Sequence, residues 1–183
     1  SVAHAAVEMS EEILGTLQGK RVLVVGAGEM GEGVAGALSR AGTASITVLN
    51  RTATRAQVLA AKIGARVSDF SNLESELGIV DVVVACTGAG DIIIDHDLMK
   101  RVRHGITTPV LLVDIALPRD IAASVSELPG VTLRDLDDLS EWAQRGIDKR
   151  SSEVGQVRVI IGEEVDRFLL DQTQRQAAPL VAQ

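Results

Sequence analysis

The sequence predicts an α/β protein built on a doubly wound parallel sheet, and three observations lead to this fold class. Short apolar runs recur along the chain, amphipathic segments with helical spacing separate them, and a glycine-rich segment follows the first run directly. Strands that alternate with helices form βαβ units, which assemble parallel sheets. A length of 183 residues with 46% hydrophobic content is enough for one substantial core.

The predicted elements follow one another in a regular order. The first helix carries apolar residues at four-residue spacing, at Ala5, Met9, Ile13 and Leu17. Buried strands are expected at 21–25, 45–49, 80–85, 110–113 and 131–133. The helices between them are expected at 32–40, 55–63 and 95–102.

A long helix is expected from about Ser140 to the C-terminus. Its apolar residues keep a spacing of three, four or seven through a polar sequence, at Ile147, Val154, Val157, Ile161, Val165 and Phe168. Such a stripe is left exposed on a small domain unless a further domain or a second copy covers it. We therefore expect residues 1–139 to form the sheet domain and residues 140–183 to form a linking helix.

Composition excludes several classes of function. A net charge of -7 and an aromatic content of 2% argue against a surface that binds nucleic acid. No apolar stretch reaches the roughly 20 residues that span a bilayer. Cys86 is the single cysteine, and the three histidines are scattered without metal-ligand spacing, so we expect a cytoplasmic protein with no metal site. The chain starts at Ser1 rather than Met, which suggests a piece of a longer protein.

Gly26, Gly28 and Gly31 form G-x-G-x-x-G between a predicted strand and a predicted helix. Gly26 permits a tight turn, Gly28 lets the backbone approach a pyrophosphate, and Gly31 allows the helix to pack closely on the strand. The N-terminus of the helix offers free N–H groups to the anion. This context predicts a Rossmann-type dinucleotide-binding domain.

The end of the second strand indicates which dinucleotide binds. An NAD site has an Asp or Glu there for the ribose hydroxyls, whereas this chain has Asn50, Arg51 and Thr52, with Arg55 one turn later. The two arginines can pair with a 2'-phosphate, and Asn50 and Thr52 can donate hydrogen bonds to it. NADPH is favoured over NADH. The alternative is that these arginines only solvate the start of a helix, where cations oppose the macrodipole.

The ligand of an open α/β sheet lies beyond the carboxyl ends of the strands. Small residues there, Thr87 and Gly88 after one strand and Ile115 and Ala116 after the next, leave room for the nicotinamide ribose. Arg119 either meets a substrate or neighbouring domain or forms a weak surface ion pair with Asp120.

Two other segments are interpreted as structural rather than functional. Cys86 is interpreted as a small buried residue rather than a nucleophile, since no histidine neighbours it in sequence. The acidic run 135–138 is expected to cap the last helix.

Several segments together resemble glutamyl-tRNA reductase. The matching segments are SVAHAAVE at 1–8, VLVVGAGEMGE at 22–32, NRTATRA at 50–56, ACTGA at 85–89, DIALPRDI at 114–121 and DLDDL at 135–139. The glycine loop and the NRT segment also occur in shikimate dehydrogenase-like domains, but GAGEMGE with DIALPRDI and DLDDL is more specific. The resemblance covers nearly the whole chain.

The resemblance implies the NADPH-binding domain of an enzyme of porphyrin, heme and other tetrapyrrole biosynthesis. In such an enzyme a separate N-terminal domain carries the catalytic cysteine and binds glutamyl-tRNA, and a C-terminal domain dimerises. This chain then contains no catalytic residue and is inactive alone, while Glu29 and Met30 of the glycine loop join the cofactor-binding residues. Two alternatives remain open, a stand-alone shikimate dehydrogenase-like NADP oxidoreductase and a non-catalytic NADP(H) sensor.

Overall fold

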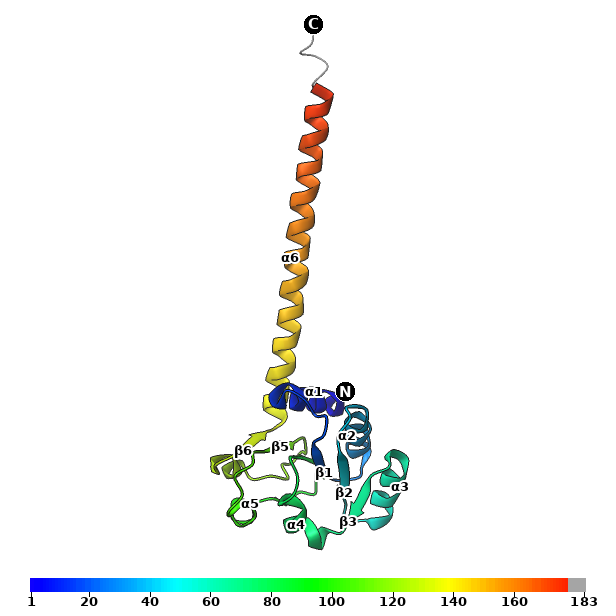
Figure 1. The fold of residues 1–183 in the computed structure, drawn as a ribbon, viewed down its shortest axis with the longest axis vertical. Coiled ribbons are helices and arrows are strands. Elements are labelled where there is room, and N and C mark those ends of the chain that lie inside the picture. The colour runs from blue at the N-terminus through cyan, green and yellow to red at the C-terminus, as the bar shows by residue number, and fades with distance from the viewer. Residues whose placement is uncertain (178–183) are drawn as a thin grey trace. The chain divides into compact units, whose positions relative to one another are not determined.

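A six-stranded parallel sheet forms the centre of the protein, in a computed structural model that describes residues 1–177 (Figure 1). The side chains of residues 158, 161 and 168–177 lie outside the described part. The strand order is β3-β2-β1-β4-β5-β6. The strands are β1 (Arg21–Val25), β2 (Ser45–Leu49), β3 (Arg66–Ser68), β4 (Val82–Ala85), β5 (Val110–Asp114) and β6 (Val131–Arg134). The expected fold class, a Rossmann-type doubly wound sheet, is confirmed.

Helices connect the strands on both faces. They are α1 (Val2–Leu14), α2 (Glu29–Arg40), α3 (Ala53–Ile63), α4 (Leu73–Leu77), α5 (His96–Arg103) and α6 (Leu136–Ala177), with 3-10 turns η1 (Phe70–Asn72) and η2 (Ala123–Glu127). Helix α1 contacts α2, and α2 contacts α3. These three helices lie over one face of the sheet, whereas α4, α5 and η2 pack on the other face.

Alternation along the strands produces these two faces. Leu23, Val83 and Leu112 are partners in one row across β1, β4 and β5, and they join the core under α4 and α5. The next residue of each strand points to the opposite face, as the period of two requires. Because both faces are covered, all four apolar residues of β1 are fully buried, which explains its continuous apolar run.

The sequence missed the segment between α3 and β4. Strand β3 has three residues of which one is apolar, and α4 has five residues, so neither carries enough periodicity to detect. Helix α2 begins at Glu29, three residues before the predicted start, since the glycine loop leads into the helix without a spacer.

The buried face of α1 also differs from the predicted stripe. Ala3, Ala6 and Ser10 are buried, whereas Ile13 is 40% exposed. Leu17 is buried, but it lies beyond the end of the helix. The small residues allow close packing on α2, where a Cβ built on Gly33 would lie 3.0 Å from that of Ala3.

The chain divides into two compact units after Ser140. The second consists of α6 from Glu141 onward, in which Ile147, Val154, Val157 and Val165 are all more than half exposed. The predicted stripe on α6 is therefore exposed at these four positions, while the side chains of Ile161 and Phe168 lie outside the described residues. None of the helices in the described residues combines the length and the hydropathy that a membrane span requires.

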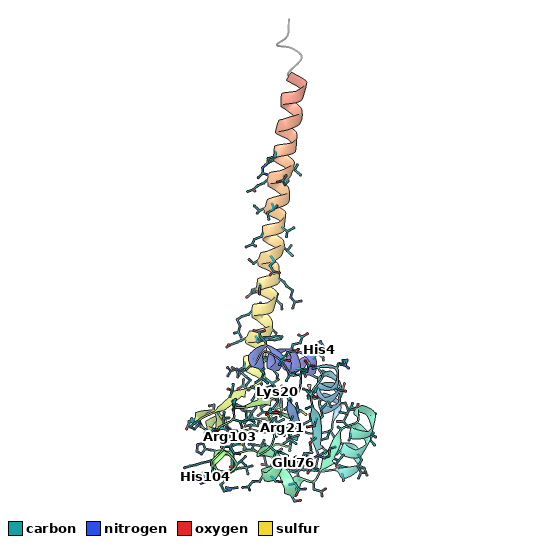
Figure 2. All side chains as sticks on the ribbon, in the orientation of Figure 1. His4, Lys20, Arg21, Glu76, Arg103 and His104 are labelled. Atoms are coloured by element: carbon teal, nitrogen blue, oxygen red, sulfur yellow. The ribbon has the colours of Figure 1, made fainter. Side chains whose placement is uncertain are left out.

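An ion pair fastens the edge strand β3 to α4. The Arg66 guanidinium donates to both carboxylate oxygens of Glu76, at 2.8 and 2.7 Å, and Glu76 is almost fully buried. Figure 2 labels Glu76, which belongs to α4. Hydrogen bonds from Arg66 lower the pKa of Glu76 below its ordinary value, against the opposing effect of burial. The ion pair thus favours the charged carboxylate in the folded state.

We expect Glu76→Gln to lower the free energy of unfolding at pH 7 by about 1 kcal/mol, because one partner of a charged hydrogen-bonded pair is lost. A lowered folded pKa stabilises the protein above the unfolded pKa, near 4.5, and this contribution disappears as pH falls through the folded value. Urea denaturation between pH 7 and 3 measures the difference, which should shrink below pH 4.5. Glu74→Gln, at an exposed ion pair on the same helix, is the control and should change stability little.

Candidate functional site

The glycine loop forms a tight turn between β1 and α2. Gly26 has a φ of 118°, and its N–H donates to the Leu49 carbonyl at 2.8 Å. A Cβ on Gly26 would lie 3.0 Å from the Cys86 carbonyl carbon, at the end of β4. Gly26 therefore sits where the backbone conformation and the neighbouring strand both require glycine.

Gly31 lies in the first turn of α2 and is buried. A Cβ there would overlap the carbonyl oxygen of Gly26, so its absence sets how closely α2 approaches β1. Gly28 is the N-cap of α2, makes no side-chain cap, and a Cβ on it would face open space. The first N–H groups of α2 are thus left without a side-chain cap, on a surface that an anion can approach.

A cavity of about 480 Å³ opens beside the loop. It is lined by residues of the loop, of α2 and of α3, namely Ala27, Gly28, Glu29, Glu32, Thr54, Arg55 and Val58. Of the predicted phosphate partners, only Arg55 is in this lining. Glu29 and Glu32 also line the cavity, and Lys62 offsets Glu32 through an ion pair of 3.3 Å.

Asn50 holds the glycine loop against the end of β2. Its Oδ1 accepts from the Ala27 N–H at 3.1 Å, and its Nδ2 donates to the Thr52 carbonyl at 3.0 Å. This positioning role was not visible from sequence, because the partner is 23 residues away. Asn50 retains one N–H for the predicted phosphate contact.

Arg51, Thr52 and Arg55 are exposed at the start of α3. Thr52 is the N-cap of this helix, but its hydroxyl makes no capping hydrogen bond. The first turn contains no acidic residue, and no carboxylate follows β2. This corner of the site is therefore cationic, although α3 begins without the negative charge that most helices favour at that end.

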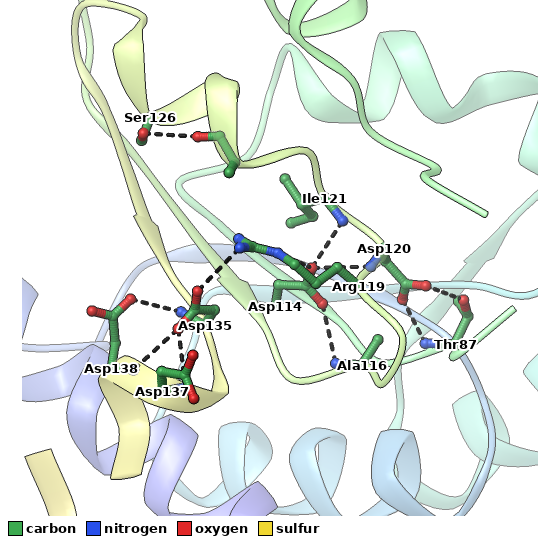
Figure 3. A network of polar contacts seen from close by, with 11 residues as sticks. Thr87, Asp114, Ala116, Arg119, Asp120, Ile121, Ser126, Asp135, Asp137 and Asp138 are labelled. Atoms are coloured by element: carbon green, nitrogen blue, oxygen red, sulfur yellow. Dashed lines mark hydrogen bonds and ion pairs between the residues drawn. The ribbon is translucent and has the colours of Figure 1, made fainter. Parts of the chain in front are cut away.

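The loop after β4 is held from below by a buried carboxylate. Asp120 accepts from the Thr87 N–H at 2.7 Å and from the Thr87 hydroxyl at 2.6 Å (Figure 3). Gly88 is exposed with a φ of 59°, and a Cβ on it would lie 3.3 Å from the Leu117 carbonyl oxygen. The hydroxyl of Thr87 is thus engaged with the protein, which leaves the exposed surface of this loop to its backbone and to Gly88.

Asp114, at the end of β5, organises the following loop. Its carboxylate accepts from the backbone N–H groups of Ala116, Asp120 and Ile121, at 3.1, 3.0 and 2.8 Å. Ile115 and Ala116 are buried, so they form the floor rather than the rim of this edge. Burial raises the pKa of Asp114 above its ordinary value, and the backbone hydrogen bonds partly oppose this shift.

Arg119 does not pair with Asp120, so the expected alternative of a surface ion pair between them is wrong. Arg119 Nη1 lies 3.2 Å from Asp135 Oδ2, and its buried Nε lies 3.9 Å from Asp114 Oδ2, beyond hydrogen-bond distance. Asp120 is fully buried. Figure 3 shows these two neighbours in sequence directed apart, with Arg119 toward Asp135 and Asp120 toward Thr87.

Asp135 caps α6 as expected. Its Oδ1 accepts from the N–H groups of Asp137 and Asp138, and Asp138 Oδ2 accepts from the Asp135 N–H in return. Asp135 therefore serves two structures at once, the helix start and the Arg119 guanidinium. No group of three or more potential metal-binding side chains occurs in the described part of the chain.

Cys86 points into the protein under the glycine loop. Its thiol donates to the Val25 carbonyl at 3.3 Å. Burial, followed by the negative charges of Asp120 and Asp114, raises the pKa of Cys86 to about 12. The thiol stays protonated at neutral pH, which supports the interpretation of a small packing residue.

The family model described as shikimate / quinate 5-dehydrogenase matches residues 8–142. This match includes every strand and the whole site described above. The chain belongs to the shikimate/quinate 5-dehydrogenase family. The glycine loop and the three strand ends all lie in the matched region.

The curated relatives confirm the resemblance to glutamyl-tRNA reductase. The chain is 39% identical over 170 residues to the glutamyl-tRNA reductase of Archaeoglobus fulgidus, covering 93% of this chain and 39% of that protein. It is 40% identical over 186 residues to glutamyl-tRNA reductase 1 of Nocardioides sp., covering 99% of this chain and 41% of the relative. The chain thus spans about two-fifths of the length of the curated relatives it matches.

Solved structures agree with the sequence relatives. The glutamyl-tRNA reductase of Methanopyrus kandleri superposes with a TM-score of 0.77 at 37% identity, covering 100% of this chain and 46% of that one. The nucleotide-binding domain of the Thermoplasma volcanium glutamyl-tRNA reductase has a TM-score of 0.64 at 18% identity, covering 82% of this chain and 96% of that chain, a likeness of fold. The dehydrogenase family model and the solved nucleotide-binding domain support the expected class of cofactor, a pyridine nucleotide.

We expect Gly31→Ala to destabilise the protein by about 1–3 kcal/mol, because its Cβ cannot fit against the Gly26 carbonyl without moving α2. Gly36→Ala on the same helix is the control, since its Cβ would meet only Arg40 at 3.6 Å. The control should keep or raise stability, as alanine favours helix. Thermal unfolding of both variants measures this, and equal stabilities would contradict the packing argument.

We expect Cys86 to react with a thiol reagent at pH 8 about a thousandfold more slowly than a free cysteine, since its pKa rises from 9.0 to about 12 and the thiolate is the reactive form. Absorbance at 412 nm with a disulfide reagent follows the reaction. Rapid labelling of the folded chain would show that the thiol is activated.

Proposed function

We propose that this chain is the NADPH-binding domain of a glutamyl-tRNA reductase and supplies the hydride that reduces an activated glutamyl group. The observation that carries the proposal is 37% identity over the whole chain to a solved enzyme of that name. The similarity covers the whole chain, including the strand-end loops and the start of α6. A shared cofactor alone would not require similarity in those segments.

Different residues bind the different parts of the cofactor. Gly26, Gly28 and Gly31 with the start of α2 bind the pyrophosphate, where Glu29 and Met30 flank it. The 2'-phosphate is bound by Arg51, Thr52, Arg55 and the remaining N–H of Asn50, at the start of α3, where the first turn has no acidic residue. Thr87, Gly88, Ile115 and Ala116 form the nicotinamide end.

When bound, NADPH supplies a hydride to the carbonyl carbon of the glutamyl group. The overall reaction consumes glutamyl-tRNA, NADPH and a proton and releases glutamate-1-semialdehyde, tRNA and NADP+, in tetrapyrrole synthesis that leads to porphyrins and heme. We assign the catalytic cysteine, the binding of glutamyl-tRNA and dimerisation to parts of the relatives that this chain does not cover. Cys86 cannot replace that nucleophile, because its buried thiol remains protonated.

The structure gives less support to a complete small dehydrogenase. Proton transfer to or from a hydroxy acid needs a positioned acid or base. Among the side chains that the structure describes, no lysine or histidine lines the loops after β4 and β5, Asp114 and Asp120 are buried under hydrogen bonds, and Asp95 accepts from the Leu98 N–H as the cap of α5. The hypothesis of a non-catalytic NADP(H) sensor is supported by the exposed stripe of α6. The same stripe equally suits a homodimer in the full protein. The free Cys86 thiol suits the reducing cytoplasm, where we place the enzyme.

The test is calorimetric titration of the chain with NADPH and with NADH. We expect NADPH to bind more tightly, and Arg55→Ala to weaken NADPH by about ten- to a hundredfold, since a charged hydrogen bond is worth roughly 1.5–3 kcal/mol. Arg51→Ala should weaken NADPH less, because Arg51 does not line the cavity. Neither change should affect NADH.

Arg40→Ala is the matched control, because this arginine lies on α2 at the end opposite the glycine loop. It should leave both affinities unchanged. Equal affinities of the unaltered chain for NADPH and NADH would refute the phosphate assignment, and failure of both nucleotides to bind would refute the proposed cofactor site.

A further inference from the structure

Two carboxylates are buried behind the carboxyl edge of the sheet. Asp114 is 1% exposed and Asp120 is 0% exposed. Asp114 is the last residue of β5, and Asp120 lies in the loop that follows it (Figure 3). A buried charge is costly unless hydrogen bonds or an opposite charge compensate it. The two aspartates differ in how this compensation is made.

Asp114 is compensated on all sides. Three backbone N–H groups donate to its oxygens, and the Arg119 guanidinium lies nearby at 3.9 Å. A cation beside the carboxylate offsets part of its field at longer range. Asp114 therefore has a mainly structural role, holding the loop closed.

Asp120 has hydrogen bonds but no compensating cation. Its two oxygens accept from the N–H and the hydroxyl of Thr87, and the hydroxyl contact of 2.6 Å is typical of a bond to an ionised carboxylate. Among the side chains described by the structure, no Lys, Arg or His lies within 4.0 Å of Asp120. The negative charge of Asp120 contributes to the raised pKa of Cys86, and its contribution is larger than that of Asp114.

The Asp120 carboxylate lies behind the point where the strand order changes direction, between β1 and β4. Thr87 follows β4, and β4 is the neighbour of β1 across the switch between the two halves of the strand order. Ligands of doubly wound sheets bind in the crevice at this point. Asp120 is therefore separated from the crevice by the Thr87 loop alone, in a buried setting where screening by salt is weak.

We propose that Asp120 is an electrostatic tuning residue, which stabilises the oxidised nicotinamide relative to the reduced one through the Thr87 loop. The proposal rests on the proposed function, because it requires NADPH to place its nicotinamide at this edge. The reduced ring is neutral and the oxidised ring carries one positive charge, so a fixed negative charge favours the oxidised form. The same field assists release of the hydride, during which positive charge develops on the ring.

The test compares the dissociation constants of NADP+ and NADPH in the unaltered chain and in Asp120→Asn. An asparagine can still accept from the Thr87 N–H and donate to the Thr87 hydroxyl, so the contacts remain while the charge is lost. We expect the ratio of the NADP+ constant to the NADPH constant to rise by roughly threefold or more. Asp81→Asn is the control, because it removes a carboxylate that precedes β4, at the strand end opposite the crevice, where it pairs with Arg21, and it should leave this ratio unchanged.

Arg119→Gln provides a second variant with the opposite expected sign, which remains decisive if Asp120→Asn does not fold. Removing this cation exposes the charge of Asp114, so the ratio should fall. An unchanged ratio in Asp120→Asn, or an unchanged or raised ratio in Arg119→Gln, would overturn the tuning role while NADPH binding itself stands. If the unaltered chain binds neither nucleotide, the proposed function fails and the tuning role fails with it.

Discussion

The approach of α2 to β1 is the constraint on which the cofactor edge depends. At this turn the carbonyl of Gly26, the backbone of Gly31 and the thiol of Cys86 meet with no room for another carbon atom. The turn therefore fixes where α2 begins and where its free N–H groups point. Asn50 extends the same constraint to β2, because its side chain holds the loop from that strand.

Electrostatics divides this edge into two regions of opposite sign. The α3 corner has exposed arginines and no acidic residue in the first turn of the helix, whereas two buried carboxylates lie behind the loops after β4 and β5. A dinucleotide phosphate has its excess negative charge at one end and, when oxidised, a positive ring at the other. The charges at the two ends of the edge therefore match the two ends of such a ligand, while Glu29 and Glu32 lie beside the glycine loop between them.

Elements with a strong local signal could be predicted from the sequence, and contacts between distant residues could not. The strands of the sheet centre were visible because burial on both faces demands apolar runs such as RVLVV. Strand β3 and helix α4 were missed because they are short, and the ion pair that joins them links residues ten positions apart. The tight turn at Gly26 and the close packing at Gly31 could be predicted, since both follow from the lack of a Cβ, whereas the approach of Gly28 to a pyrophosphate stays a prediction. The positioning roles of Asn50 and Asp120 were not found, because their partners are 23 and 33 residues away.

The double engagement of Asp135 restricts which residues can occupy this position. Its carboxylate must be short enough to accept from the backbone at the start of α6, and it must be charged to neutralise Arg119. Serine and asparagine satisfy the first demand and fail the second, while the extra methylene of glutamate suits the second and disturbs the first. Asp135 is thus a position of very low substitution tolerance, although it is neither fully buried nor part of the cofactor cavity.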